Sequence, residues 1–188
     1  LIRDLQSAKS ITNPEDQERF RLQVTQAALP LLEKVINEGN ITARSVAIRA
    51  LPELEVLTPS PLQRRLKMYD QVDDALIRIL QNKDQPDFVK LRAAEAIRQY
   101  LEKADAVPQV ELALANALAD QLRNPLSEWE YQYALIDVIS RVRPTREVVG
   151  VKKPTVIEVL VEVLQDSQRD ILVRCSAAGA LGRVPFDA

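Results

Sequence analysis

Histidine is absent from this sequence of 188 residues, and there is a single cysteine, Cys175. Without histidine, the chain lacks the commonest general base, the commonest zinc ligand and the base of the histidine-dependent nucleophile triads. One cysteine can form neither an internal disulfide nor a metal site built from several cysteines, which favours a reducing compartment. We therefore expect a cytoplasmic protein with no catalytic residue, no metal ion and no cofactor.

Glycine, long apolar runs and net charge are also in short supply. The four glycines, Gly39, Gly150, Gly179 and Gly182, form neither a phosphate-binding loop nor a dinucleotide-binding fingerprint. No apolar run approaches the ~20 residues of a membrane span, and we expect neither a membrane-spanning helix nor a signal peptide. The net charge of -2, from 25 basic and 27 acidic residues, argues against a dedicated nucleic-acid binder.

The sequence does contain a succession of helix signals. Asn13 and Pro14 provide a capping side chain and a first-turn proline, so a helix is expected from there to about residue 37. Gly39 and Asn40 separate it from a second helix over about 41–56, whose last turns Pro52 should bend. The same plan of two helices recurs at about 61–81 with 86–103, 108–122 with 128–143, and 154–164 with 170–182.

Apolar spacing predicts which side of each helix is buried. In the last helix, Val173, Ala177 and Ala180 share one face, and their small side chains allow a neighbouring helix to come close. Ser127 and Glu130 match a reciprocal capping box at the start of the sixth helix. The buried stripe expected for the first helix consists of Leu22, Leu29, Leu32, Val35 and Ile36.

The helix pairs recur at a nearly constant interval. The last apolar residues of the first helices, Ile36, Leu80, Leu122 and Leu164, are 44, 42 and 42 residues apart. A second landmark agrees, because Arg44, Lys90, Gln132 and Arg174 are separated by 46, 42 and 42 residues. We call these four the register positions. A fixed period of this size is typical of stacked helical repeats. The repeats are expected at about 14–57, 60–104, 107–143 and 154–184, within one domain over 1–188.

The second helix of the last pair resembles a known repeat family. Asp170–Gly182 reads Asp-x-x-Val-Arg-x-x-Ala-Ala-x-Ala-Leu-Gly, and Pro30 lies inside a first helix. These features resemble HEAT repeats, particularly the bacterial type of the phycobilisome-lyase-like proteins. The resemblance implies an all-α protein, a right-handed α-solenoid of about four helix pairs. In the family an Asp and an Arg form a ladder between repeats, which implies an inter-repeat structural role for Arg44, Lys90, Asp170 and Arg174.

Aromatic residues gather at one place. Trp129, Tyr131 and Tyr133 are three of the eight aromatic residues in the chain. Trp129 and Tyr133 fall on a variable, partly polar column of the second helices, and in a solenoid those helices line the concave surface that binds partners. We expect these two rings to be the anchors of a partner site, with Arg49, Arg98 and Arg141 around them. The alternative is that both rings fill irregular packing where the alanine pair is missing.

The leading hypothesis is thus a non-enzymatic scaffold that binds a protein or peptide. The resemblance alone also allows a bilin-lyase-like enzyme or a chaperone. Binding of nucleic acid is a third possibility, because Arg141, Arg143, Arg146, Lys152 and Lys153 form a basic patch, but no aromatic residues are interleaved and a solvated loop is favoured. Cys175 lies beside Arg174, yet without a histidine partner a packed or idle thiol is favoured.

The ends of the chain predict an incomplete stack. Leu1 is not a methionine, and Leu1–Leu5 reads as the end of an apolar helical face, with a remnant helix expected over Leu1–Lys9. The fourth repeat ends at Leu181–Arg183 without a polar capping helix, whereas the terminal repeats of a complete array need a polar outer face. We therefore expect a segment of a longer protein, with apolar residues exposed near both ends.

Overall fold

The structure is a computed structural model that describes residues 11–55, 70–103, 108–124, 128–141 and 156–183. Within these ranges there are eight α-helices and one 3-10 helix, and no strand, so the expected all-α class is confirmed. The expected helix over Leu1–Lys9 lies outside the described residues. The same holds for the helix start at 60–61, for Ser127, and for Arg143, Arg146, Lys152 and Lys153 of the basic patch.

The first helix pair follows its capping signals. Helix α2 spans Pro14–Glu38, and the Asn13 side chain accepts a hydrogen bond from the Glu15 N–H at 3.0 Å. Helix α3 spans Ile41–Ala50, and Asn40 caps it in the same way by accepting from the Ala43 N–H at 2.9 Å. These side chains satisfy N–H groups that have no partner inside the helix.

Proline changes the helix type at the end of this pair. The sequence predicts one bent helix to about residue 56, but α3 ends at Ala50 and a 3-10 helix, η2, follows over Leu51–Glu55. Pro52 has no N–H to donate to the Ile48 carbonyl, and the Leu51 N–H bonds to that carbonyl instead, three residues back. Pro52 therefore changes the helix from α to 3-10 at the place where the sequence predicts a bend.

The remaining helices lie close to the predicted ranges. Helix α8 differs at both ends, because it begins one residue later than a Ser127 cap requires and ends at Ile139, four residues before the predicted end. Glu128 is the N-cap and makes no side-chain capping bond, so the predicted capping box is wrong. Instead, the Glu128 N–H donates to Asp87 Oδ2 at 3.2 Å, across to the preceding helix pair. The observed bounds are α5 Asp70–Gln81, α6 Asp87–Lys103, α7 Pro108–Leu122, α8 Trp129–Ile139, α9 Val156–Gln165 and α10 Ile171–Leu181.

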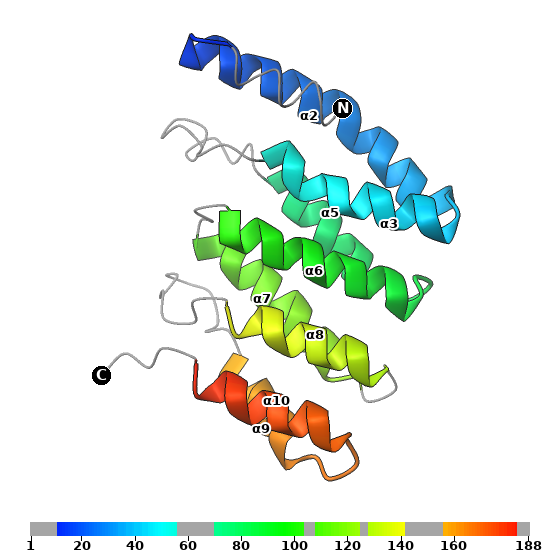
Figure 1. The fold of residues 1–188 in the computed structure, drawn as a ribbon, viewed down its shortest axis with the longest axis vertical. Coiled ribbons are helices and arrows are strands. Elements are labelled where there is room, and N and C mark those ends of the chain that lie inside the picture. Colours follow the sequence, from blue (N-terminus) through cyan, green and yellow to red (C-terminus); the bar gives the residue numbers. More distant parts are fainter. Residues whose placement is uncertain (1–10, 56–69, 104–107, 125–127, 142–155, 184–188) are drawn as a thin grey trace.

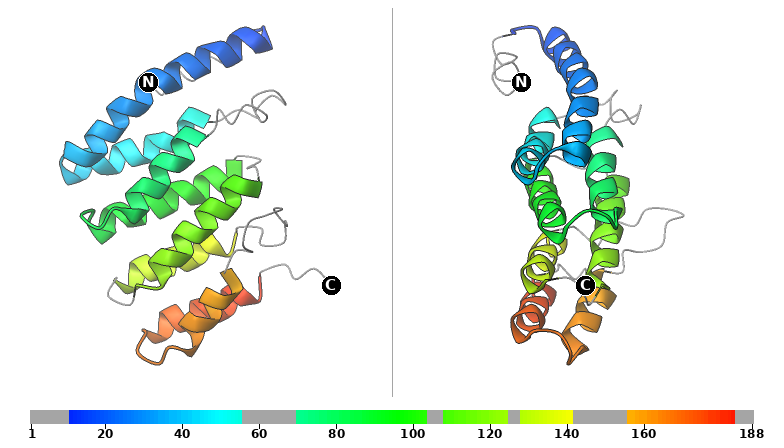
Figure 2. Two further views of the ribbon diagram at one scale, coloured as in Figure 1. Left: turned by 180° about the vertical axis from the view of Figure 1, so that it is seen from behind. Right: turned by 90° about the vertical axis from the view of Figure 1, so that its right-hand side faces the viewer.

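The helices form two layers, stacked in chain order. Helices α3, α6, α8 and α10 each contact the next of the four, and we call them the second-helix layer (Figure 1). Helices α2, α5, α7 and α9 form the first-helix layer, in which α5 contacts α7 and α7 contacts α9. Figure 2 shows the two layers side by side along the length of the stack. The second helices all start at the same edge, on the right in Figure 1, so they run parallel to one another.

The core lies between the layers and matches the predicted faces. Leu114, Leu118 and Leu122 of α7 are fully buried, as are Val173, Ala177 and Ala180 of α10. Each buried leucine contributes about 1.5–3 kcal/mol relative to an exposed one, and the alanines let the layers approach closely. Val35 is an exception to the predicted stripe, being 37% exposed. Helix α2 has a neighbour on only one side among the described residues, so Val35 has nothing to pack against there.

Candidate interaction surface

Trp129 and Tyr133 project from the second-helix layer, one turn apart on α8. Trp129 is 42% exposed and Tyr133 is 50% exposed, whereas Tyr131 between them is 2% exposed. A helix turns about 100° per residue, so residues four apart share a face and residue 131 points the opposite way. The two outward rings are too exposed to act as core plugs, and Tyr131 takes the buried place.

Buried contacts hold the exposed rings in position. Leu135, Ile136 and Ile139 anchor the inner side of α8 with no exposed surface. The Tyr131 O–H donates to Gln121 Oε1 on α7 at 3.4 Å. Burial raises the pKa of the Tyr131 phenol well above its usual range, and the charge of Asp87 raises it further. The start of α8 is therefore fastened to both layers, and the exposed rings stand on a rigid base.

An apolar row continues from Trp129 along the same edge of the layer. Each of the four second helices exposes a large apolar side chain in its first turn. Neighbouring packed helices lie about 8–10 Å apart, so the row repeats at that spacing. Arg92 also lies over the Phe88 ring, 5.3 Å from its centroid, which holds that ring from one side. The apolar row consists of Ile41, Phe88, Trp129, Ile171 and Leu172.

The predicted arginines do not surround the rings. Arg49 and Arg141 are exposed and Arg98 is partly buried, all towards the ends of their helices. Arg141 lies 12 residues beyond Trp129, which is about 18 Å along a helix at 1.5 Å per residue. It pairs with Asp137 at 3.4 Å. The second helices run parallel, and Arg49, Arg98 and Arg141 lie farther along the chain direction of their helices than the apolar row does (Figure 1).

The predicted ladder residues make different kinds of contact. Arg44 reaches the next pair, where its Nη1 donates to Gln85 Oε1 at 3.1 Å. Its Nη2 also donates to the Asn37 carbonyl of its own pair. Arg174 Nε donates to the Leu164 carbonyl at 3.0 Å, and Asp170 caps α10 by accepting from the Leu172 N–H at 2.7 Å. These contacts of Asp170 and Arg174 lie within their own pair. Lys90 is buried in α6.

Two junctions between pairs have a polar contact of this kind, and the second one uses Gln132, which the predicted set of inter-repeat residues does not include. Gln132 Oε1 accepts from Arg169 Nη1 at 2.7 Å. Arg169 stands five residues before the register position Arg174, as Gln85 stands five before Lys90. Both contacts therefore join a register position to the turn of the next pair. The arginine is at the register position in the first contact and in the turn in the second, with glutamine at the other position. A comparison of residue types at the register positions therefore could not predict these contacts.

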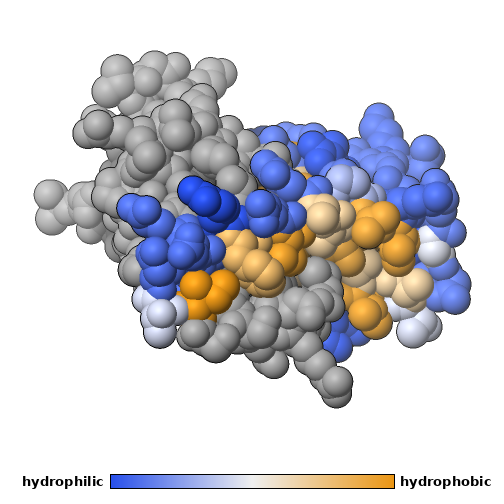
Figure 3. Space-filling model, turned by 90° about the horizontal axis from the view of Figure 1, so that it is seen from above, coloured by the Kyte–Doolittle hydropathy of each residue, from blue (hydrophilic) through white to orange (hydrophobic). Residues whose placement is uncertain are grey.

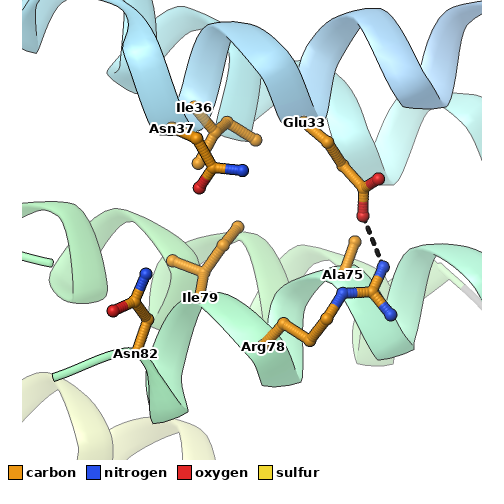
Figure 4. Close-up of a pocket in the computed structure, with 7 residues that line it drawn as sticks. All are labelled: Glu33, Ile36, Asn37, Ala75, Arg78, Ile79 and Asn82. Atoms are coloured by element: carbon orange, nitrogen blue, oxygen red, sulfur yellow. Dashed lines mark hydrogen bonds and ion pairs between the residues drawn. The ribbon is translucent and has the colours of Figure 1, made fainter. Parts of the chain in front are cut away.

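A shallow groove lies on the opposite layer, between α2 and α5. Figure 4 shows Glu33 and Arg78 reaching across it as an ion pair. Two further polar groups in it are engaged, because Asn37 Oδ1 accepts from Gln85 and Asn82 Oδ1 accepts from the Asp84 N–H. The groove therefore offers a ligand few unpaired polar groups. Its lining is Glu33, Ile36, Asn37, Ala75, Arg78, Ile79 and Asn82.

The described residues bring together no group of three or more histidine, cysteine, aspartate or glutamate side chains able to hold a metal ion. Cys175 is exposed on α10. None of the helices in the described ranges combines the length and apolar character needed to cross a membrane. Within these ranges, the most distinctive surface is the apolar row together with the exposed Tyr133 ring.

Comparison with known protein families, with curated proteins and with solved structures finds no match to this chain. What the structure itself supports is an all-helical protein whose helix pairs pack in chain order, with an exposed apolar row along one edge of one layer.

Proposed function

We propose that the chain is a non-enzymatic, HEAT-like α-solenoid that binds a protein or peptide along the outer face of its second-helix layer. Two features support the architecture: a period of 42–46 residues in the sequence, and helix pairs that pack in chain order. A layer of parallel helices presents its side chains in rows, which suits an extended or helical segment of a partner.

The exposure of Trp129 and Tyr133 carries this proposal. An exposed tryptophan leaves a large apolar surface in water, and such residues are over-represented among the few that dominate binding energies. Exposed apolar residues also lie in the first turns of α3, α6 and α10, at the same edge of the layer. Exposed apolar residues gathered along one edge favour a protein-binding site.

Trp129 is the only tryptophan of the chain, so its fluorescence reports directly on this surface. A peptide selected from a displayed library against the wild-type protein should shift the emission to shorter wavelength, because binding removes the indole from water. Trp129→Ala should then weaken the affinity by about 2 kcal/mol or more, which is about 30-fold in Kd.

Leu31→Ala provides the matched control, since it truncates an exposed apolar side chain on the other layer. That variant should bind the selected peptide as tightly as the wild type does. The proposal is wrong if peptides selected from the library bind the wild type, Trp129→Ala and Tyr133→Ala with equal affinity. Unchanged helical circular dichroism in each variant would establish that the comparison concerns binding alone.

A further inference from the structure

Helix α8 has a described neighbour on each side, because it packs between α6 and α10 (Figure 1). Trp129 and Tyr133 are thus exposed on a helix inside the described stack. The exposed apolar residues of α2 differ in this respect. Figure 3 looks onto α2 and shows a strip of apolar residues bordered by hydrophilic ones. Residues 1–10 lie outside the described residues, so the structure does not show what adjoins that strip, whereas the surroundings of Trp129 are described on both sides.

Three carboxylates lie at the start of α8, beside Trp129. Glu128 and Glu130 are its neighbours in sequence, and both are exposed. Asp87 of α6 joins them, because its Oδ2 accepts from the Glu128 N–H at 3.2 Å. Glu130 stands 42 residues after Phe88, so it takes the place in α8 that an exposed ring takes in α6. The Trp129 ring therefore stands in a negatively charged part of the edge where the second helices begin.

Positive charge at the same edge is mostly buried or engaged. Lys90 of α6 is 7% exposed, and the Arg169 side chain, 8% exposed, donates to side chains of α8 and of its own turn. Arg174 of α10 donates to a backbone carbonyl of its own pair. Lys83 is exposed in the turn before α6, where the neighbouring Asp84 offsets its charge. Within the described part of this edge, exposed acidic side chains therefore outnumber exposed basic ones.

Arg92 shows how a cation contacts an aromatic ring at this edge. It lies over the Phe88 ring, 5.3 Å from the centroid, and its Nη1 pairs with Glu95 at 2.6 Å. In α8 its place is taken by Ala134, 42 residues later. Among the described residues, no cationic side chain lies over the Trp129 ring. Tryptophan attracts a cation to its face more strongly than phenylalanine does, so the ring best suited to a cation is the one without it.

We propose that the partner is a basic segment of a protein, with an arginine or lysine that lies over the Trp129 ring beside the carboxylates of Asp87, Glu128 and Glu130. The inference rests on the proposed binding function and adds the charge of the partner to it. A cation placed there is attracted both by the ring and by the carboxylates. An acidic segment, or the phosphates of a nucleic acid, would meet like charges at the same place and be repelled.

The composition of selected peptides tests this directly. Peptides selected from the displayed library on the wild-type protein at low salt should be enriched in arginine and lysine relative to the unselected library. Selection on the double variant Glu128→Gln with Glu130→Gln should lose that enrichment and keep the enrichment in apolar residues, since Trp129 is unchanged. The Glu128 side chain makes no capping bond and Glu130 is exposed, so the fold should accept both amides, and circular dichroism checks this.

Affinity measurements add the magnitude. An exposed ion pair changes Kd by up to about fivefold, so the double variant should bind a basic peptide about tenfold more weakly than the wild type at low salt. Raising the salt from about 0.01 M to about 1 M shortens the Debye length from about 30 Å to about 3 Å, and it should remove most of this difference. Asp74→Asn is the matched control, because it neutralises an exposed carboxylate of α5 on the other layer and should bind as the wild type does.

The outcomes separate this inference from the proposed function. Selected peptides that need Trp129 but show no enrichment in basic residues would overturn the basic partner and leave the proposed function standing. Equal affinity of the wild type and the double variant for a basic peptide would have the same meaning. Selected peptides that bind Trp129→Ala and Tyr133→Ala as tightly as the wild type would overturn the proposed function and this inference with it. If the double variant does not fold, Glu130→Gln alone takes its place.

Discussion

Arg169 donates to the Gln132 side chain across 37 residues of sequence, and this 2.7 Å hydrogen bond joins the turn before α10 to helix α8 of the preceding pair. Both side chains are largely buried. Arg44 and Gln85 form the same kind of contact two pairs earlier. There the donating arginine is at the register position and the accepting glutamine is in the turn. These two junctions are therefore held by apolar packing together with a polar rung that joins a register position to the turn of the next pair.

Gln132→Ala should destabilise the fold by about 1.5–3 kcal/mol, because it removes the acceptor of the Nη1 group of a buried guanidinium, which keeps only its Nε contact with Asp166. Chemical denaturation of this variant, of Arg169→Ala and of the double variant would measure their coupling. We expect a coupling energy of about 0.5–3 kcal/mol, as found for residues in direct contact. Additive losses would show that the hydrogen bond contributes nothing to the junction.

Gly39 and Gly179 should respond to alanine with opposite signs. A methyl group at Gly39 would lie 2.5 Å from the Val35 carbonyl oxygen, so Gly39→Ala should cost about 1–3 kcal/mol through forced backbone movement. At Gly179, within α10, a methyl group would meet no atom within 4 Å. Gly179→Ala should therefore stabilise the protein by about 0.5–1 kcal/mol, since alanine loses less freedom in a helix. Thermal melts of the two variants test both signs.

Tyr131 should make the fold sensitive to alkaline pH. Burial raises its pKa in the folded state, whereas an unfolded tyrosine ionises near pH 10. The neutral phenol is thus the form that the fold favours, and this contribution is present below about pH 10 and lost as the pH rises further. Denaturation midpoints of the wild type should fall between pH 9 and pH 11 more steeply than those of Tyr131→Phe. Parallel curves would contradict the assignment.

Asp166 should act in the opposite pH range. Its pKa is lowered first by the hydrogen bond from the Gln168 N–H at 3.0 Å and then by Arg169. A carboxylate with a lowered pKa stabilises the fold above the unfolded value of about 3.9, and this contribution is lost as the pH falls through the folded value. We therefore expect Asp166→Asn to flatten the loss of stability below about pH 4.

An equivalent turn of this chain already has asparagine at the position of Asp166. Asn82 occupies the equivalent turn two pairs earlier, and its Oδ1 accepts from the Asp84 N–H at 2.9 Å, as Asp166 accepts from Gln168. Asparagine at 166 should therefore keep the turn while removing its titration. A variant whose acid unfolding matches that of the wild type would show that other carboxylates set the acid limit.

Much of the fold was predictable because local chemistry decides it. Asn13 with Pro14 marks the start of α2, and Pro52 marks the change of winding after α3, since capping and a missing N–H act within one turn. Burial followed from apolar periodicity in the interior pairs. The prediction that Val35 is buried was wrong. Its burial depends on whether another pair covers α2, and the apolar pattern of α2 does not contain that information.

For the candidate surface, the sequence predicted which side of a helix a residue lies on, but not how far along the helix axis it lies from its neighbours. Register counting placed Trp129 and Tyr133 on an outward column, and the structure exposes both. It placed Arg141 near them because counting faces ignores how far apart residues lie along the axis. The same procedure gave Gln132 no contact between pairs, since its partner Arg169 lies in a turn of the next pair and no helix periodicity connects them.

The role of Trp129 can be decided by comparing two losses of stability. Trp129→Ala should lower the free energy of unfolding by about 1 kcal/mol at most, because much of the ring is already in water. Leu135→Ala, on the buried side of the same helix, should cost about 2–5 kcal/mol, since it opens a cavity in a fully buried site. Urea denaturation with a common slope measures both. A loss of about 3 kcal/mol or more from Trp129→Ala would make the ring a packing element, and a partner surface would then have to be sought away from the apolar row.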